Sequence, residues 1–269
     1  MTAKKINLNA IYHSDCVKFM ESMDENFVDL TVTSPPYDNL RNYKGYHFDF
    51  ENIVKGLYRV TKKGGVVVWV VGDKIIKGDR TLTSFKHALF FQERGFNVHD
   101  IMIYRKKNTP FMRSNAYTNC YEFMLVFSKG APNTFHPIME KTVRQGFEMM
   151  PFNKGADAIN NKTLKELKAE KTRTNIWEYA VGLGGTTSDR EAFKHPAVFP
   201  EKLAEDHIIS WTNEGDIVFD PMCGSGTTCK MAKKNNRRYL GCDISDEYVR
   251  IAKQRLEKIN SNFTLFPEI

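Results

Sequence analysis

Short apolar runs and amphipathic stretches alternate along most of the chain. Many of the apolar runs are rich in valine, isoleucine and phenylalanine, and three of them end directly before glycine or aspartate, which is typical of β-strands. We expect strands at 10–12, 27–32, 66–71, 98–104, 123–127, 216–219 and 238–242. Amphipathic stretches predict helices at 17–23, 50–60, 82–91, 203–211, 228–234 and 246–258. This alternation predicts a doubly wound α/β domain.

Residues 130–195 interrupt that alternation. Periodicity weakens, glycine and asparagine become more frequent, and lysine accumulates against few acids. We therefore expect a small lobe inserted at 131–194 between two halves of one domain, which occupy 1–130 and 195–269.

Length and composition set broad limits. A chain of 269 residues that is 41% hydrophobic can bury one large core, or one core with an inserted lobe. The sequence contains no run of about 18 apolar residues, so we expect no membrane span. Residues 1–7 have no apolar signal region, which favours a cytoplasmic protein. The five cysteines lack metal-binding spacing, so we expect free thiols and no metal site. The net charge of +7 is compatible with a polyanionic partner.

The strand at 27–32 runs into a candidate catalytic motif, Thr33-Ser34-Pro35-Pro36-Tyr37. Two prolines end the strand in a rigid turn. The motif then offers a hydroxyl, a carbonyl without a strand partner and an aromatic face, a set that suits a flat group with an amino substituent. Pro-Pro-Tyr also occurs in proline-rich ligands and ordinary turns, so the motif alone decides nothing.

A second motif spans Val218–Thr228, where an apolar strand enters a turn with glycines at 224 and 226. Glycine lets the backbone pass close to a ligand. Asp243 ends the next strand, where an acid commonly holds a ribose diol. A dinucleotide fold is the rival interpretation, but position 229 is cysteine in place of its third glycine. A nucleoside without a pyrophosphate, S-adenosylmethionine, is therefore favoured.

Together the two motifs resemble those of the DNA amino-methyltransferases, which methylate the exocyclic nitrogen of cytosine or adenine. The proline motif precedes the glycine turn, an order similar to that of the permuted β group. Further blocks match this family in its order: Ile11–Cys16, Gly64–Asp73, Tyr121–Gly130 and His195–Leu203. The resemblance covers most of the chain. It implies a Rossmann-like methyltransferase sheet with circularly permuted motifs and an inserted target-recognition lobe.

The resemblance also implies roles for the motif residues. Ser34 and the Pro35 carbonyl would accept hydrogen bonds from the target amino group, Pro36 would fix the turn and Tyr37 would stack on the base. Asp220 and the glycine turn would hold the methionine end of the cofactor, Asp243 its ribose, and Asp15 with Phe199 its adenine. The full predicted cofactor set is Asp15, Cys16, Phe199, Lys202, Asp220, Gly224, Gly226, Thr227 and Asp243.

DNA is the implied substrate, and its target base must be flipped out of the duplex. Cations in the loop at 38–47, in the loop at 105–115 and in the lobe suit phosphate contacts, with solvated connectors as the competing interpretation. They are Arg41, Lys44, Arg105, Lys106, Arg113, Arg144, Lys154 and Arg173. Tyr43 or Tyr46 would face bases. We expect Trp177 and Tyr179 to anchor the core, and His195 to hold the turn into Pro196.

Several alternatives remain open from the sequence. Ser34 at the first position of the tetrapeptide resembles cytosine-N4 enzymes, although an adenine-N6 enzyme of the same group is the nearest alternative. A methyltransferase of RNA or protein amides and a non-catalytic DNA-binding module are further hypotheses. A cognate restriction endonuclease is a candidate partner, and either a monomer or a homodimer fits.

Overall fold

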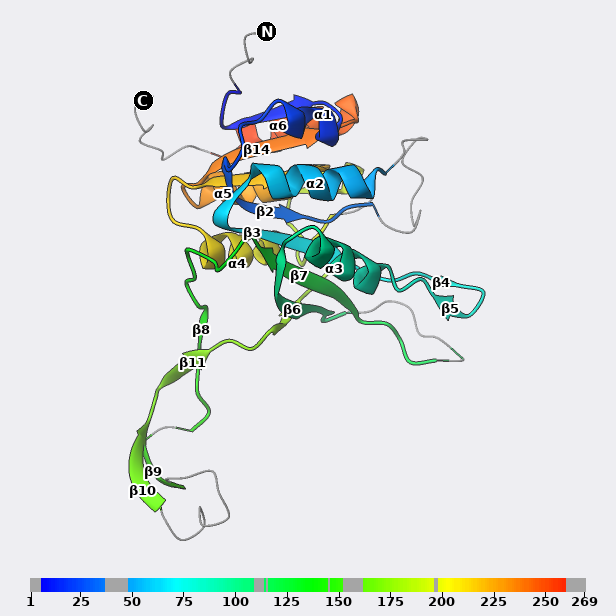
Figure 1. Ribbon diagram of the computed structural model, residues 1–269. Helices are drawn as coiled ribbons and strands as arrows, with labels where there is room; N and C mark the ends of the chain where they lie inside the picture. The colour runs from blue at the N-terminus through cyan, green and yellow to red at the C-terminus, as the bar shows by residue number, and fades with distance from the viewer. Residues whose placement is uncertain are drawn as a thin grey trace. The chain divides into compact units, whose positions relative to one another are not determined.

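The structure is a computed structural model that describes residues 6–36, 48–108, 114, 116–144, 146–151, 162–195 and 198–259 (Figure 1). It divides into two compact units. The main unit comprises the chain up to His136 and from Asn175 onward, and the hairpin unit comprises Pro137–Thr174. Several residues with predicted roles lie outside the described residues: Tyr37, Arg41, Tyr43, Lys44, Tyr46, Arg113, Lys154 and Pro196.

An eight-stranded sheet forms the centre of the main unit, in the order β1-β14-β13-β2-β3-β7-β6-β12. Strand β7 is antiparallel to both of its neighbours, and the other described pairings in this sheet are parallel. The strands are β1 (Ala10–His13), β2 (Val28–Thr33), β3 (Thr61–Val71), β6 (Asn97–Lys106), β7 (Tyr121–Ser128), β12 (Ile176–Tyr179), β13 (Ile217–Asp220) and β14 (Arg238–Asp243). A short pair, β4 (Ile75–Ile76) with β5 (Asp79–Arg80), precedes the helix at Thr83–Glu93.

Helices cover both faces of this sheet (Figure 1). They are α1 (Cys16–Glu21), α2 (Phe50–Val60), α3 (Thr83–Glu93), α4 (Glu201–Trp211), α5 (Thr227–Lys234) and α6 (Asp246–Glu257), with a short 3₁₀ helix, η2 (Arg190–Lys194). The first three pack on one face, and α4, α5 and α6 pack against one another on the opposite face. The predicted doubly wound, Rossmann-like α/β fold is confirmed.

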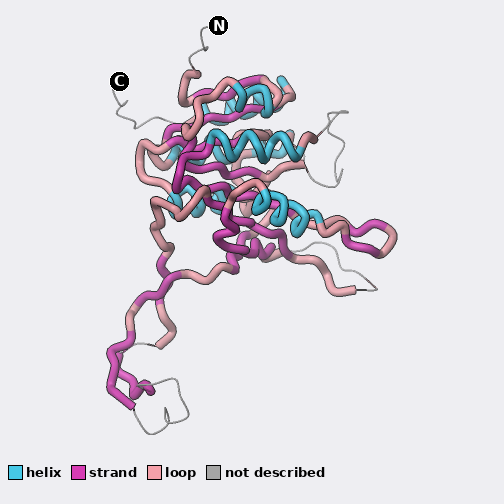
Figure 2. Tube along the Cα trace, in the orientation of Figure 1, coloured by secondary structure: helices cyan, strands magenta, loops and turns pink. Residues whose placement is uncertain are grey.

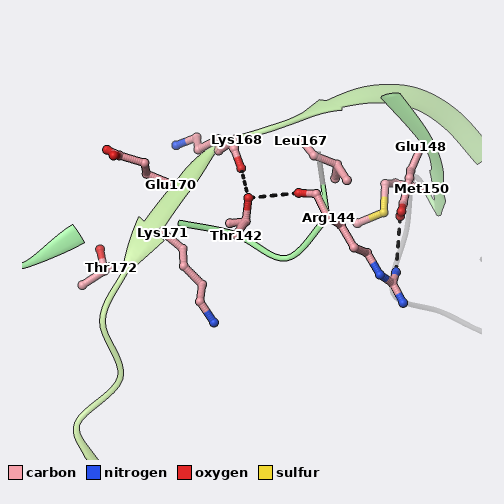
Figure 3. A pocket seen from close by; sticks show the side chains of 9 residues that line it. All are labelled: Thr142, Arg144, Glu148, Met150, Leu167, Lys168, Glu170, Lys171 and Thr172. Carbon is pink, nitrogen blue, oxygen red and sulfur yellow. Dashed lines mark hydrogen bonds and ion pairs between the residues drawn. The ribbon is translucent and has the colours of Figure 1, made fainter. Parts of the chain in front are cut away.

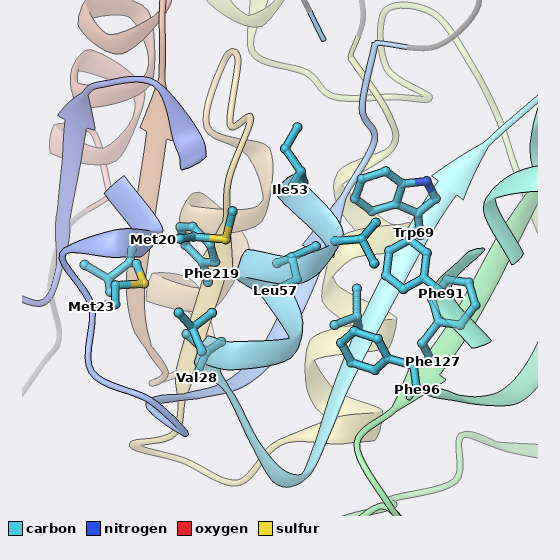
Figure 4. Close-up of a cluster of buried hydrophobic side chains, with 14 of the residues drawn as sticks. Met20, Met23, Val28, Ile53, Leu57, Trp69, Phe91, Phe96, Phe127 and Phe219 are labelled. Carbon is cyan, nitrogen blue, oxygen red and sulfur yellow. The ribbon is translucent and has the colours of Figure 1, made fainter. Parts of the chain in front are cut away.

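A cluster of buried hydrophobic side chains lies beneath α1, α2 and α3 (Figure 4). Strand β3 sends Val67, Trp69 and Val71 into it. The alternate residues Val66, Val68 and Val70 are also buried, outside this cluster. Because β3 is covered on both faces, its sequence is continuously apolar rather than alternating.

Two strands differ from the sequence prediction. Strand β6 continues to Lys106, two residues past the expected end, so Arg105 and Lys106 lie on a strand and not in a loop. Strand β12 was not predicted as a strand; it adds to the sheet edge in parallel with β6. Its alternating residues Trp177 and Tyr179 are each only 5% exposed, so their predicted core-anchoring role is confirmed.

The hairpin unit contains two antiparallel strand pairs. Strand β9 (Gly146–Pro151) pairs with β10 (Lys162–Leu167), and β8 (Met139–Lys141) pairs with β11 (Glu170–Thr172). Figure 2 shows strands joined by loops, and no helix, in the described part of this unit. This unit is shorter than the lobe expected at 131–194, because β12 joins the main sheet and η2 packs against α6.

Among the described residues, no helix has the length and apolar character needed to cross a membrane.

Candidate active site

Four parallel strands bring the two sequence motifs to one edge of the sheet. Strands β1, β14, β13 and β2 are consecutive neighbours, so their carboxyl ends meet. Ser34 follows β2, Asp220 ends β13, Asp243 ends β14 and Asp15 follows β1. In open α/β sheets, ligands bind outside this edge. This edge is therefore the candidate active site.

Two buried hydrogen bonds join the motifs directly. The Thr33 hydroxyl donates to Asp220 Oδ1 at 2.8 Å, and the Thr228 hydroxyl donates to the Val32 carbonyl at 2.9 Å. Segments nearly two hundred residues apart are thereby held side by side, immediately before Ser34 and at the start of α5. The expected convergence of the two motifs is borne out for these residues.

The Asp220 carboxyl group lies at the centre of this junction and is 1% exposed. Its Oδ1 also accepts a hydrogen bond from the Met222 N–H at 3.2 Å. Burial raises the pKa of Asp220 to about 6, although donors from Thr33, Met222 and Thr228 oppose the rise. Asp220 thus connects β13 to the end of β2, and its contact with the methionine end of a cofactor stays a prediction.

The glycine turn requires both of its glycines. Gly224 has φ +47°, and a Cβ there would lie 2.7 Å from His195 Nε2; Gly226 has φ +76°, and its Cβ would lie 2.7 Å from the Ala252 Cβ. The turn closes through a 2.6 Å bond from the Gly226 N–H to the Cys223 carbonyl. His195 is buried and meets the Tyr248 ring edge-on, so it packs behind the turn. A side chain at 224 or 226 would therefore clash with the residues packed against the turn.

Asp243 is bonded to the same turn. Its Oδ2 accepts from the Gly224 N–H and its Oδ1 from the Ser245 N–H, both at 2.9 Å. Burial raises the pKa of Asp243, and these backbone donors oppose the rise. The predicted acid and the glycine turn therefore form one hydrogen-bonded unit at the ends of β13 and β14.

The remaining predicted cofactor residues lie in varied settings. Asp15 caps α1 by accepting from the Lys18 N–H at 3.0 Å. Burial raises the pKa of Cys16 to about 12, so its thiol is neutral. Phe199 is half-buried just before α4. Lys202 extends from α4 to Asp206 and Glu205, at 2.7 and 3.1 Å, so local carboxylates already pair its charge.

These residues fit the cofactor that the sequence favours. Two buried carboxyl groups stand at the ends of adjacent strands, and the compact glycine turn follows the first of them. The nearby thiols of Cys223, Cys229 and Cys242 are buried, and burial raises the pKa of each far above its usual value, so they add no negative charge. Carboxyl groups for a diol and an amine beside a compact glycine turn suit a sulfonium nucleoside.

Arg255 was not predicted from the sequence, and its side chain lies beneath the glycine turn with no exposure to solvent. It contacts Ser225, Thr227, Asp189 and Glu201. A signal was present, because Arg255 follows Val249 and Ala252 on the buried stripe of α6. A cation on such a stripe indicates a buried partner.

Every described cation of the predicted DNA-binding set has a carboxylate partner. Arg105 pairs with Glu178, and Lys106 with Glu122 at 2.6 Å. In the hairpin unit, Arg144 pairs with Glu148 at 3.4 Å and Arg173 with Glu140 at 3.3 Å. These pairs reduce the positive potential near each cation, and DNA contact stays a prediction.

The hairpin unit also has a hollow of about 480 Å³ between its two strand pairs (Figure 3). Cations outnumber acids among its lining residues, which are Thr142, Arg144, Glu148, Met150, Leu167, Lys168, Glu170, Lys171 and Thr172.

Across the described part of the chain, no group of three or more histidine, cysteine, aspartate or glutamate side chains could hold a metal ion.

Comparison with known proteins links this geometry to a chemistry. The model of the N6/N4 family, described as DNA methylase, matches residues 28–254. The orphan methyltransferase M.BamHII of Bacillus amyloliquefaciens is 51% identical over 246 residues, which cover 88% of this chain and 91% of that protein.

Solved structures show the same fold. The PvuII DNA methyltransferase, described as cytosine-N4-specific, superposes with a TM-score of 0.68 at 21% identity and covers 97% of this chain and 90% of its own. The complex of M1.HpyAVI with SAM superposes with a TM-score of 0.61 at 26% identity, covering 92% and 98%.

Proposed function

The chain belongs to the N6/N4 DNA methylase family, and on that basis we propose that it methylates the exocyclic N4 of a flipped cytosine in duplex DNA. The methyl donor is S-adenosyl-L-methionine. The observation that carries the proposal is the junction of Thr33 with Asp220, because it sets the proline motif beside the glycine turn. A donor site and an acceptor site then share one edge of the sheet.

When bound, S-adenosyl-L-methionine supplies an electrophilic methyl group. Asp243 would hold the ribose diol, and Asp15 with Phe199 the adenine. Asp220 and the Gly224–Gly226 turn would hold the methionine end. The turn is preformed by its bonds to Asp243 and Cys223, so little backbone conformational freedom is lost on binding.

The target amino group is a weak nucleophile because its lone pair is delocalised into the ring. The Ser34 hydroxyl and the Pro35 carbonyl would accept its two hydrogens, which draws the nitrogen toward tetrahedral geometry and frees the lone pair. Both acceptors follow β2 directly, and β2 is held by its pairing with β3 and by Asp220. Aligned acceptors of this kind act by positioning and electrostatics, with little general base catalysis.

Ser34 supports cytosine over adenine. Family members with serine at this position resemble cytosine-N4 enzymes, and those with aspartate are mostly adenine-N6 enzymes. A hydroxyl and a carboxylate can each accept one hydrogen bond, so an N6-adenine activity is the second candidate.

The hairpin unit is our candidate for target recognition. It lies between the two halves of the methyltransferase domain in sequence, and its hollow carries Arg144, Lys168 and Lys171. Cations there would contact phosphate, while exposed side chains such as Phe147 and Met149 would be available to base edges.

Label transfer from methyl-tritiated S-adenosyl-L-methionine to DNA, RNA and protein tests the proposal. We expect label in DNA, recovered as N4-methylcytosine after digestion to nucleosides. N6-methyladenine would establish the second candidate, and label in RNA or protein alone would overturn the assignment to DNA.

Ser34→Ala provides the residue-level test. It should reduce methyl transfer at least a hundredfold, on the scale of losing one aligned acceptor, while cofactor binding stays unchanged. The matched control is Ser22→Ala: the Ser22 hydroxyl bonds the Phe19 carbonyl at the end of α1 and should not affect transfer. Equal transfer by the Ser34 variant and the wild type would refute the catalytic role of Ser34.

A further inference from the structure

Arg255 is a buried cation that the proposed chemistry does not use. It comes from the last turn of α6, and its side chain has 0% exposure. Burying a guanidinium is costly unless charges and acceptors surround it, so an arginine in this position must have several partners. Its partners come from three separate segments of the chain.

The first segment is the glycine turn itself. Nη1 of Arg255 donates to the Ser225 carbonyl at 2.5 Å, with the Ser225 and Thr227 hydroxyls at 3.1 and 3.3 Å. One helical turn earlier, Ala252 packs against Gly226 so closely that a Cβ on the glycine would clash. Helix α6 therefore supports the turn from its inner side at two points.

The second segment is η2. Nε of Arg255 donates to Asp189 Oδ2 at 2.9 Å, and Asp189 caps η2 through the Glu191 N–H at 3.1 Å. Burial alone would raise the pKa of Asp189, but the bond and charge of Arg255 outweigh it and hold that pKa below its usual value. At the other end of η2, His195 packs against Gly224.

The third segment is the start of α4. Nη2 of Arg255 donates to Glu201 Oε1 at 2.7 Å, and Glu201 also accepts from Lys230 at 2.6 Å and Thr187 at 2.7 Å. Phe199 lies between the two carboxylates Asp189 and Glu201 in sequence, two residues before the latter. The two cations Arg255 and Lys230 balance these two acids, so the cluster is neutral.

We propose that Arg255 is a positioning residue for S-adenosyl-L-methionine: it holds the glycine turn, η2 and the start of α4, which Phe199 precedes by two residues, in the arrangement that binds the cofactor. The inference rests on the proposed function. Lysine cannot replace arginine here, because a compact ammonium lacks the planar fork that reaches three segments at once.

Arg255→Lys tests this inference, with S-adenosyl-L-methionine binding measured by calorimetry without DNA. We expect the Kd to rise on the order of tenfold, the scale of removing one or two hydrogen bonds to a charged group. Turnover at saturating cofactor should stay within about twofold of wild type, because Arg255 does not touch the reacting atoms. The matched control is Arg250→Lys on the same helix, where Arg250 is 69% exposed and pairs locally with Asp246; its Kd should not change.

Asp189→Asn is the second variant and tests the connection if Arg255→Lys does not fold. Asparagine still caps η2, so only the pairing with Arg255 is weakened. The Kd of Asp189→Asn for S-adenosyl-L-methionine should also be higher than that of the wild type.

The outcomes are distinct. A wild-type Kd for a folded Arg255→Lys, or for Asp189→Asn where Arg255→Lys does not fold, would reduce Arg255 to a purely structural role and overturn the inference, whatever the melting temperature. A wild-type protein that binds no S-adenosyl-L-methionine would instead overturn the proposed function.

Discussion

Thr33 and Asp220 share a buried hydrogen bond of 2.8 Å although 187 positions separate them in the chain. Thr33 is the last residue of β2, immediately before Ser34, and Asp220 is the last residue of β13, immediately before the glycine turn. The bond therefore joins the two halves of the proposed reaction at the point where each leaves the sheet.

Thr33→Val should weaken both stability and catalysis. Valine keeps the shape of the side chain but leaves the buried Asp220 carboxyl group short of one donor, at a cost of about 1–3 kcal/mol in the free energy of unfolding. Methyl transfer should also fall, because the end of β2 loses its side-chain hydrogen bond to β13. Chemical denaturation and a transfer assay measure the two effects.

Thr33→Ser is its control, because serine retains the hydroxyl. It should preserve most of the activity. Wild-type activity in Thr33→Val together with a loss in Thr33→Ser would show that the methyl group, and not the hydroxyl, is the important part of the Thr33 side chain.

Asp220→Asn should change how stability depends on pH. Burial raises the pKa of Asp220 to about 6, so the folded state binds a proton more tightly than the unfolded state does. Between about pH 4 and pH 6 the contribution of this group to the free energy of unfolding should fall as pH rises, by on the order of 3 kcal/mol, and then level off. Asparagine does not titrate, so it should abolish this component.

The measurement is the free energy of unfolding from pH 4 to pH 8 for both proteins. The difference between wild type and Asp220→Asn should shrink or reverse in sign as pH rises. Parallel curves across this range would show that Asp220 has the same pKa in both states.

Gly224→Ala should disturb the turn in two ways. Alanine is strained at φ +47°, at about 1–2 kcal/mol, and its Cβ would lie 2.7 Å from His195 Nε2. We expect lower stability and weaker S-adenosyl-L-methionine binding, measured by thermal denaturation and calorimetry.

Gly182→Ala separates these two causes. Gly182 has φ +88° but has nothing within 4 Å of a built Cβ, so it carries the backbone strain without the clash. It should destabilise less and leave cofactor binding unchanged. Equal losses at 182 and 224 would show that the contact with His195 is unimportant.

Removing charge from the hairpin unit should weaken DNA binding. The triple change Arg144→Gln, Lys168→Gln and Lys171→Gln removes three exposed cations that line the hollow. The slope of log affinity against log salt should become shallower by up to about 0.9 for each phosphate that the protein no longer neutralises. S-adenosyl-L-methionine binding should not change, since these residues belong to the hairpin unit.

The matched control removes three exposed lysines from helices of the main unit, Lys55, Lys86 and Lys253, for which no DNA contact is predicted. Fluorescence anisotropy at several salt concentrations compares the two triple variants. Identical salt slopes would mean that only the net charge of the protein matters, and that the hairpin unit does not contact DNA.

Local pattern was enough to predict most of the elements that form the site. Helix α2 was expected at 50–60 and runs from Phe50 to Val60. Its apolar residues recur with a 3.6-residue period, and this period depends only on neighbours in sequence. Strand β12 has just four residues, and its alternation was too short to indicate a strand.

The family, the order of the motifs and the residue types available for chemistry could all be predicted, because they depend on identity and spacing along the chain. The pairing of side chains could not be predicted: Thr33 bonds to Asp220, Arg105 and Lys106 face carboxylates, and Arg255 lies buried beneath the glycine turn. The physical reason is that a charge or hydroxyl acquires its partner from packing between distant segments. No local pattern encodes which segments will meet.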